Sequence, residues 1–250
     1  MWRNRPTFDC ASQKMKLNFK GERVLAVVAH PDDAELFCAG TLARARQDDA
    51  TIAVCVMCQG DKGQPSKTVR NLASVRRKEA QAACKLLGAE FFHGGVPDGM
   101  LSDDAATRRT LLEIYRQFKP SLVLAHSPDD YHADHRAAAA LAEAVSWFCA
   151  SRGYRSKSSA LPSAPALWWM DTLNMLGFTP DFFVDITPFA VLKERMMTCH
   201  KSQLLRAKDA DFSPLTDLMR WQMQTRGRQA GVAAAEAFRV HNSYKRARAW

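Results

Sequence analysis

The sequence lacks any apolar run long enough to cross a membrane, because no stretch of its 250 residues approaches the roughly 18 apolar residues that a spanning helix needs. Residues 1–22 contain no apolar signal-peptide core either. The seven cysteines are an odd number in a chain too long to depend on disulfide cross-links, which favours reduced thiols. We therefore expect a cytoplasmic protein without a membrane span, and the sequence is compatible with a homo-oligomer.

A dinucleotide-binding fingerprint is also missing, since no G-x-G-x-x-G follows the first apolar run at residues 23–29. A non-catalytic sugar- or nucleotide-binding protein on a Rossmann-like sheet is therefore the weaker alternative. The net charge of +9 and the pI of about 9.4 favour anionic partners. Basic residues are dispersed, however, with clusters only at residues 152–157 and 245–248. This dispersion disfavours a nucleic-acid partner, and a small anionic ligand fits the charge equally well.

Short apolar runs alternate with longer helical patterns from Arg23 onward, which is typical of βαβ units around a parallel sheet. The expected strands are residues 23–29, 51–57, 89–94, 120–127, 166–171 and 181–187. The expected helices are residues 33–47, 69–88, 104–118, 134–150, 188–207 and 215–227. We expect a single α/β domain over residues 1–250, with a Rossmann-like, mostly parallel sheet and helices on both faces. Residues 1–21 are expected to form an N-terminal extension and residues 151–165 an exposed loop.

Two clusters of histidine and aspartate follow expected strands. The first, His-Pro-Asp-Asp at residues 30–33, follows the first strand, and the second, at residues 126–135, follows the fourth. Charged groups beside a core are costly unless they are paired or bound to a metal. With the common strand order 3-2-1-4, the first and fourth strands flank the point where open α/β sheets bind ligands. We therefore expect the two clusters to meet in one crevice.

Two histidines and one carboxylate with an open fourth position form a recurring catalytic zinc site. His30 and Asp33 can chelate from one turn that Pro31 stiffens, and the second cluster supplies the third ligand. Asp32 is then free to act as general base on the metal-bound water. The competing interpretation, aspartates that cap a helix and structural histidines, explains one cluster more readily than two. Such a site also accepts other divalent ions, such as Fe²⁺.

At these motifs the chain resembles the PIG-L/LmbE-like family of zinc-dependent N-deacetylases. "AHPDDAE" at residues 29–35 matches the family's A-H-P-D-D-x-E, and "HADHR" at residues 132–136 matches its H-P-D-H with Ala133 in place of proline. Shorter similarities extend along nearly the whole chain. One difference is "CQGDKG" at residues 58–63, where the family usually has Thr-x-Gly-Glu.

The resemblance implies an enzyme that removes an acetyl group from the amide nitrogen of an N-acetylglucosamine-type conjugate. By position, it makes His30, Asp33 and His135 the zinc ligands and Asp32 the general base. It makes His132 the cationic partner that stabilises the oxyanion or protonates the departing amine. The implied partner is a small N-acetylated amino sugar, with an anionic group as one option.

The resemblance also implies residues that contact the substrate. Arg76 and Asp98 correspond to the family's substrate-binding arginine and aspartate, and Tyr131 is a further candidate beside His132. Asp134 is expected to orient His132, with helix capping as the equally weighted alternative.

Several conspicuous residues carry no functional prediction. Trp168 and Trp169 are expected in the core rather than in a cleft, and His200 has no assigned role beyond packing or hydrogen bonding. Cys55 and Cys58 form a C-x-x-C within an expected strand, where positions three apart point to opposite faces, so they are interpreted as buried thiols. The basic C-terminal residues are interpreted as a solvated tail.

Overall fold

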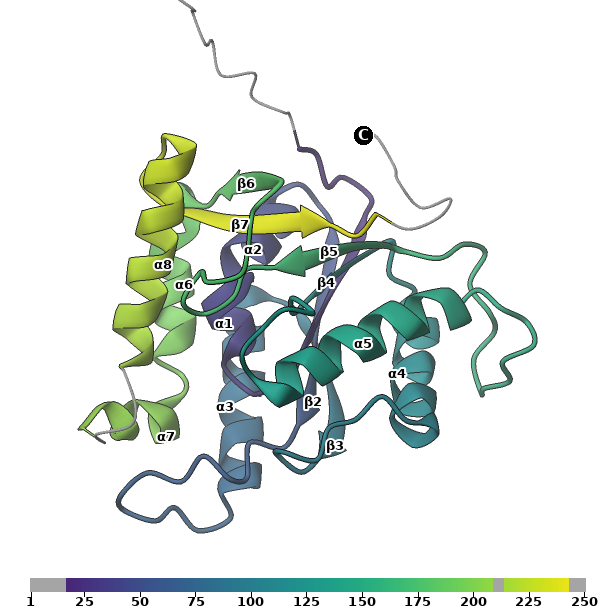
Figure 1. Ribbon diagram of the computed structural model, residues 1–250, viewed down its shortest axis with the longest axis horizontal. Helices are drawn as coiled ribbons and strands as arrows, with labels where there is room; N and C mark the ends of the chain where they lie inside the picture. Colours follow the sequence, from purple (N-terminus) through teal and green to yellow (C-terminus); the bar gives the residue numbers. More distant parts are fainter. Residues whose placement is uncertain (1–16, 209–213, 243–250) are drawn as a thin grey trace, which may run out of the picture.

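A computed structural model of the protein describes residues 17–208 and 214–242; residues 1–16 of the expected extension and the basic tail at 245–248 lie outside the described residues. Seven strands form one sheet in the order β3-β2-β1-β4-β5-β7-β6, and helices pack on both of its faces (Figure 1). This is the mixed α/β domain with a mostly parallel sheet that the alternating pattern predicts. None of the helices in the described ranges is long and apolar enough to cross a membrane.

The elements follow one another as alternating strands and helices up to β5. The strands are β1 (Arg23–Val28), β2 (Thr51–Cys58), β3 (Glu90–Val96), β4 (Leu122–Ala125), β5 (Ala166–Met170), β6 (Phe182–Asp185) and β7 (Ala235–Val240). The α-helices are α1 (Asp33–Phe37), α2 (Ala39–Gln47), α3 (Leu72–Leu87), α4 (Ala105–Phe118), α5 (Ala133–Phe148), α6 (Ala190–Met197), α7 (Lys201–Leu204) and α8 (Leu215–Ala230). Two short 3₁₀ segments, Thr187–Phe189 and Leu205–Lys208, flank α6 and α7.

The sheet is buried on both faces, because consecutive side chains of a strand point to opposite sides. In β1, Val24, Ala26 and Val28 contact one apolar cluster, whereas Leu25 and Val27 contact another. Helices α1, α2, α3, α6 and α8 contribute to the first cluster, and α4 and α5 contribute to the second. A parallel strand buried on both faces appears in the sequence as a continuous apolar run, which is why β1 is easily recognised.

The parallel part of the sheet has the expected strand order. Val24 of β1 pairs with Ile52 of β2 on one side and with Leu122 of β4 on the other. The carboxyl ends of β1 and β4 therefore lie next to each other. β5 adds to the parallel set beside β4, and its Trp168 and Trp169 are buried, one in each apolar cluster, as expected.

The prediction of a single helix over residues 33–47 is wrong, because the structure has two helices there, α1 and α2. The helical conformation is interrupted at Cys38, whose φ of −146° and ψ of 5° lie outside the helical region. This residue therefore separates α1 from α2. Gly40, in the first turn of α2, packs so closely on Ile186 that an added Cβ would lie 2.7 Å from its side chain. The break is a tertiary feature, since no proline stands at this point to signal it.

The C-terminal third differs most from expectation. The helix expected over residues 188–207 is divided between α6, α7 and the 3₁₀ segments. Residues 235–240, for which no strand was expected, form β7, which pairs antiparallel with both β5 and β6. Glu236 interrupts the apolar pattern of this strand although it is buried, and this hides the strand from a reading of hydrophobicity alone.

Residues 151–165 connect α5 to β5 and are mostly exposed. Buried Arg116 of α4 donates hydrogen bonds to the carbonyl oxygen of Ser151 at 2.8 Å and to the hydroxyl of Ser156 at 2.9 Å. Glu113 accepts a hydrogen bond from the hydroxyl of Ser158 at 2.6 Å. The loop is thus held against α4 by its own backbone and hydroxyl groups.

Candidate active site

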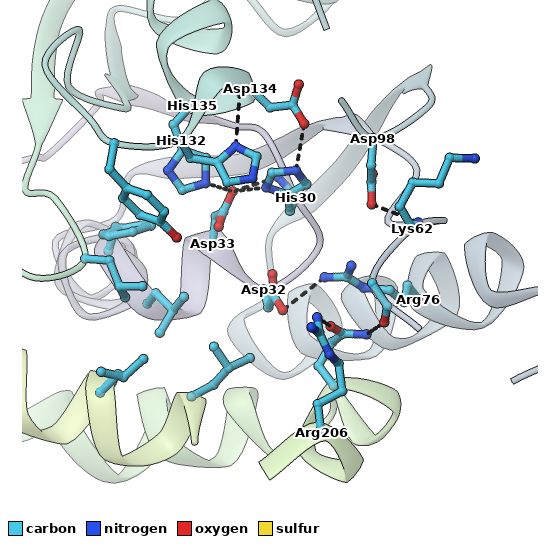
Figure 2. Close-up of a pocket in the computed structure, with 18 of the residues that line it drawn as sticks. His30, Asp32, Asp33, Lys62, Arg76, Asp98, His132, Asp134, His135 and Arg206 are labelled. Atoms are coloured by element: carbon cyan, nitrogen blue, oxygen red, sulfur yellow. Dashed lines mark hydrogen bonds and ion pairs between the residues drawn. The ribbon is translucent and has the colours of Figure 1, made fainter. Parts of the chain in front are cut away.

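The two histidine and aspartate clusters meet at the carboxyl ends of β1 and β4, as the strand order requires. They line a cavity of about 550 Å³ (Figure 2), whose other polar lining residues include Lys62, Arg76, Asp98 and Arg206. His30 follows β1, His126 follows β4, and His132 and His135 lie at the start of α5. Neighbouring parallel strands therefore bring together residues about a hundred positions apart.

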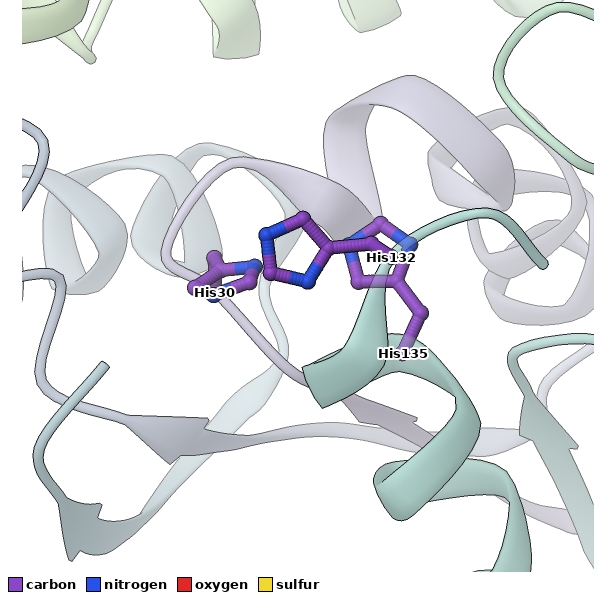
Figure 3. A group of neighbouring side chains, drawn as sticks. All are labelled: His30, His132 and His135. Carbon is purple, nitrogen blue, oxygen red and sulfur yellow. The ribbon is translucent and has the colours of Figure 1, made fainter. Parts of the chain in front are cut away.

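Asp33 is the centre of this cluster. Its Oδ2 atom accepts a hydrogen bond from the backbone N–H of His30 at 2.6 Å. The same oxygen lies 3.5 Å from His30 Nδ1, 3.4 Å from His135 Nε2 and 3.2 Å from His126 Nε2. His30, His132 and His135 also each offer a ring nitrogen within 4.8 Å of the others (Figure 3). The predicted ligands His30, Asp33 and His135 thus lie together.

The two predicted histidine ligands, His30 and His135, each contact a second carboxylate through their other ring nitrogen. His30 Nε2 lies 3.1 Å from Asp134 Oδ2, and His135 Nδ1 lies 3.1 Å from Asp130 Oδ1. The other ring nitrogen of each histidine faces Asp33. Metal-binding histidines typically pair their outer nitrogen with a carboxylate in this way. Two imidazoles and one carboxylate are nitrogen and oxygen donors that suit Zn²⁺, so these residues fit the expected metal.

The charges of the cluster compensate one another. Burial lowers the pKa of His30, but the carboxylates of Asp134 and Asp33 outweigh it and raise this pKa to about 10. In the same way, burial opposes but Asp33 and Asp130 raise the pKa of His135 to about 9. Burial disfavours the charged form of Asp33, yet the charge of His135 holds its pKa well below the usual range. The site is therefore built around a buried anion that requires cationic neighbours.

His126 also contacts Asp33, and its place in the second cluster of the sequence indicated no role for it. It is fully buried, and its Nε2 atom accepts a hydrogen bond from the backbone N–H of Ala29 at 3.0 Å. Burial lowers the pKa of His126 to about 4, so the ring is neutral at physiological pH. Its position directly after β4 is the sequence signal that could have assigned it to the base of the site.

Asp32 lies beside this cluster in an unusual backbone conformation, with φ 135° and ψ −17°. Residues other than glycine rarely adopt this backbone conformation, and each such residue costs on the order of 1–3 kcal/mol of conformational strain. Burial raises the pKa of Asp32, and the guanidinium of Arg76 opposes that rise. Asp32 lines the cavity. Within the described residues, its carboxylate bonds to Arg76 and not to the histidines.

Arg76, expected to contact the substrate, also donates hydrogen bonds to neighbouring residues of the protein. Its Nη2 atom donates to Asp32 Oδ2 at 3.0 Å and to the carbonyl oxygen of Pro31 at 2.9 Å. The side chain is buried and passes Gly60, where an added Cβ would lie 2.8 Å from the guanidinium arm. Arg76 lines the cavity as well, but its hydrogen bonds hold Asp32 in place.

Asp134 was expected to orient His132, but its carboxylate faces His30. Its carboxylate accepts hydrogen bonds from the backbone N–H of Gly99 at 2.8 Å and pairs with His30, so it orients His30 rather than His132. Only its backbone N–H reaches His132, donating to Nδ1 at 3.1 Å. This bond leaves the Nε2 atom of His132 to carry the proton of the neutral ring. Tyr131 lines the same cavity and is 61% exposed.

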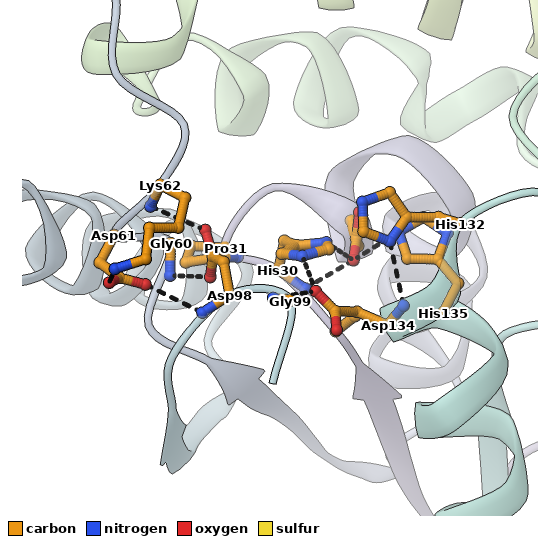
Figure 4. A network of polar contacts seen from close by, with 12 residues as sticks. His30, Pro31, Gly60, Asp61, Lys62, Asp98, Gly99, His132, Asp134 and His135 are labelled. Carbon is orange, nitrogen blue, oxygen red and sulfur yellow. Dashed lines mark hydrogen bonds and ion pairs between the residues drawn. The ribbon is translucent and has the colours of Figure 1, made fainter. Parts of the chain in front are cut away.

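Asp98, the other expected substrate contact, joins two loops at the rim of the cavity (Figure 4). Its carboxylate accepts from the backbone N–H of Gly60 at 2.7 Å and from that of Lys62 at 3.2 Å. Its own N–H donates to Asp61 Oδ1 at 2.9 Å, and Lys62 Nζ lies 2.6 Å from Asp61 Oδ2. Asp61, which replaces the family's glutamate, therefore helps to fix this loop.

Two buried ion pairs beneath the site have no counterpart in the sequence predictions. His200 Nε2 lies 3.2 Å from Glu35 Oε2, and Lys193 Nζ contacts Glu236. Glu35 belongs to α1, two residues after Asp33, so the unassigned His200 contacts the helix that carries Asp33. Only the folded chain shows these partners, because the paired residues lie far apart in sequence.

Comparison with known proteins gives a consistent result. The family model described as "PIG-L: GlcNAc-PI de-N-acetylase" matches residues 25–159, more than half of the chain. The chain is 29% identical to 4-oxalmesaconate hydratase of Pseudomonas putida, over 78% of each chain. It is 26% identical to diacetylchitobiose deacetylase of Thermococcus kodakarensis, over 73% of this chain and 70% of that protein. The crystallised N,N'-diacetylchitobiose deacetylase of Pyrococcus horikoshii superimposes with a TM-score of 0.78 at 25% identity, covering 89% of this chain and 85% of the other.

Proposed function

The chain belongs to the PIG-L family, and on this basis we propose that it is a metal-dependent N-deacetylase acting on an N-acetylglucosamine-type conjugate. The observation that carries the proposal is the geometry at Asp33, where two histidines, each backed by a carboxylate, face one shared carboxylate oxygen. Asp32 stands beside them without belonging to that set. A metal-binding trio with a separate buried carboxylate supplies the activated water and the proton acceptor with which an amide can be hydrolysed.

We assign His30, Asp33 and His135 as the ligands of a divalent ion, with Zn²⁺ as the first choice and Fe²⁺ also compatible with the donors. When bound, such an ion lowers the pKa of a coordinated water to about 7 and polarises the amide carbonyl. Asp134 and Asp130 fix the ring orientation of the two histidines and increase their basicity.

The proton transfers belong to Asp32 and His132 in this proposal. Asp32 accepts the proton of the attacking water, and its hydrogen bond to Arg76 holds the carboxylate toward the cavity. His132, protonated at Nε2, donates a hydrogen bond to the oxyanion of the tetrahedral intermediate. An amine leaves poorly without a proton, so one of these two groups must supply it as the C–N bond breaks.

The cavity supports a substrate larger than a single sugar. Its volume of about 550 Å³ is within the range of roughly 300–1,000 Å³ typical of sites for drug-sized ligands. Lys62, Arg76 and Arg206 lie on the side away from His132 (Figure 2), and Leu173, Leu215 and Leu218 add an apolar lining. We infer an N-acetylated amino sugar joined to a second group, which carries a negative charge if it reaches the basic side.

A second candidate function is the hydration of a carbon–carbon double bond in an unsaturated carboxylic acid. The identity to 4-oxalmesaconate hydratase favours it, and the basic side of the cavity suits a carboxylate. Asp32 would again take a proton from water, and the same group would return it to carbon. Both reactions use one water-activating centre, so the substrate distinguishes them. A non-catalytic sugar- or nucleotide-binding role is disfavoured.

The deciding experiment compares two assays on zinc-loaded, full-length protein. Acetate release from N-acetylglucosamine conjugates tests deacetylation, and loss of ultraviolet absorbance from conjugated oxo-dicarboxylic acids tests hydration. We expect acetate release that disappears when the metal is chelated and returns when Zn²⁺ is added. Metal-dependent hydration without acetate release would favour the second candidate, and failure to retain any divalent metal would overturn both.

The assignment of the base is tested by Asp32→Asn. Replacing the carboxylate by an amide removes the proton acceptor without removing a metal ligand, so turnover is expected to fall by about 10²–10⁴-fold while zinc content stays the same. Asp129→Asn is the matched control, because Asp129 is an exposed carboxylate near the same end of the sheet that pairs with Arg239. Full turnover in zinc-loaded Asp32→Asn would show that another group is the base.

The cytoplasmic location and the homo-oligomeric state stay predictions.

A further inference from the structure

The junction between α1 and α2 is joined by a buried ion pair from the far end of the chain. Lys193 of α6 and Glu236 of β7 contact each other with side chains only 1% and 3% exposed. Lys193 Nζ donates to the carbonyl oxygen of Leu36 at 2.9 Å, at the end of α1. α6 packs on α1 and β7 packs on α2 (Figure 1).

Glu236 completes the other side of this junction. Its two carboxylate oxygens accept hydrogen bonds from the backbone N–H groups of Gly40 at 2.9 Å and Thr41 at 2.7 Å, in the first turn of α2. Cys38, the residue before α2, provides no side-chain cap. The pair therefore places a cation at the carboxyl end of one helix and an anion at the amino end of the next, which satisfies free backbone groups and both helix dipoles.

α1 depends on such external support. It has only five residues, too few for a helix to be stable by itself, and Asp32, which precedes its first residue Asp33, makes no side-chain capping bond. At its amino end, Arg76 holds Asp32 and the Pro31 carbonyl. At its other end, the contact from Lys193 fixes the last turn.

We propose that Lys193 and Glu236 are positioning residues, which clamp the α1–α2 junction so that Asp33 and Asp32 keep the spacing needed for metal binding and proton transfer. The inference rests on the proposed function and adds two residues that do not line the metal cluster. A burial role alone would be served by an apolar pair of similar size. A lysine and a glutamate are needed here because the junction exposes both a carbonyl and two N–H groups.

The test uses Lys193→Met and the double variant Lys193→Met/Glu236→Gln in full-length protein. The single variant leaves Glu236 charged and buried without its partner, so a lower unfolding midpoint is expected. The double variant removes both charges and retains an amide that can accept from α2, so its midpoint should return toward wild type. We expect its Zn²⁺ dissociation constant to stay about tenfold or more above wild type, and kcat to fall with little change in KM.

The matched control is Asp171→Asn/Arg226→Met, which neutralises another buried pair, formed by Asp171 directly after β5 and Arg226 of α8, whose bonds to each other do not involve α1. This control should alter the unfolding midpoint and leave Zn²⁺ affinity unchanged. Recovery of wild-type Zn²⁺ affinity and kcat together with the midpoint in the double variant would reduce Lys193 and Glu236 to a structural role and overturn the inference. If wild-type protein binds no metal and releases no acetate, the proposed function fails first, and the inference fails with it.

Discussion

The two halves of the sheet differ in strand direction and in what their polar residues do. β3, β2, β1 and β4 are parallel, and the segments that follow β1 and β4, including the first turns of α1 and α5, supply the proposed ligands His30, Asp33 and His135. β5, β7 and β6 include antiparallel pairs and are surrounded by buried ion pairs, such as Lys193 with Glu236 and Asp171 with Arg226. Chemistry is concentrated where parallel strands end together, and support comes from the region that folds against it.

The largest loss of Zn²⁺ affinity is expected when Asp33, the central carboxylate at the end of the parallel strands, is removed. Asp33→Ala removes the oxygen that both proposed histidine ligands share, so Zn²⁺ affinity should fall by more than the roughly 10–100-fold typical of residues that only orient a ligand. Zinc content after dialysis against a competing chelator, together with acetate release, measures this. Asp129→Ala, at an exposed aspartate, should retain both. Full zinc stoichiometry in Asp33→Ala would contradict the assignment.

In the antiparallel half, the same kind of change should affect stability instead. Arg226 donates to Asp171 at 2.6 and 2.9 Å, and both side chains are buried. Arg226→Met leaves Asp171 unpaired, which we expect to lower the free energy of unfolding by ~3–5 kcal/mol, less if Asp171 takes up a proton. Urea titration measures this change. Arg220→Met, which breaks an exposed pair with Glu194, should leave the midpoint nearly unchanged. Equal effects of the two variants would mean that burial does not decide the outcome.

Arg76 sharpens the comparison, because its hydrogen bonds suggest positioning whereas the family pattern suggests substrate binding. If Arg76 mainly holds Asp32, Arg76→Met should lower kcat by about 10–100-fold with little change in KM or in zinc content. If it mainly binds substrate, KM should rise while kcat is preserved. Steady-state kinetics on one N-acetylated conjugate separates these results. Arg76→Lys keeps the charge but cannot form the same pair of bonds, so only partial activity is expected.

The smallest effect is expected at Glu113, which holds the loop after α5. Hydrogen bonds from Ser158 lower the pKa of Glu113 from 4.5 to about 2. A lowered carboxyl pKa stabilises the fold above the unfolded value of 4.5, and this contribution is lost as the pH falls from 4.5 toward 2. Glu113→Gln should therefore lower the melting temperature slightly at pH 7 and hardly at all near pH 2. Because the group is exposed to screening, a large shift or one independent of pH would contradict this account.

The parallel half shows how much of the site could be predicted from sequence. β1 and β4 are apolar runs that end on histidine and aspartate, and the common strand order then places His30, Asp33 and His135 in one crevice. The partner of Asp134 could not be predicted, because the choice between His30 and His132 depends on side-chain direction at the start of α5. For the same reason, the bond between Arg76 and Asp32 is absent from any local pattern.

The sequence by itself determined the α/β class and the motifs that follow the strands, because periodicity and motif position are local properties of the chain. That these motifs meet followed only once the common strand order was assumed. Only the tertiary structure decided where α1 ends, that residues 235–240 form a strand, and that Lys193 and Glu236 lie beneath the site. These features depend on groups that become neighbours only when the chain is folded, since a buried charge is tolerated where a partner from a distant segment meets it.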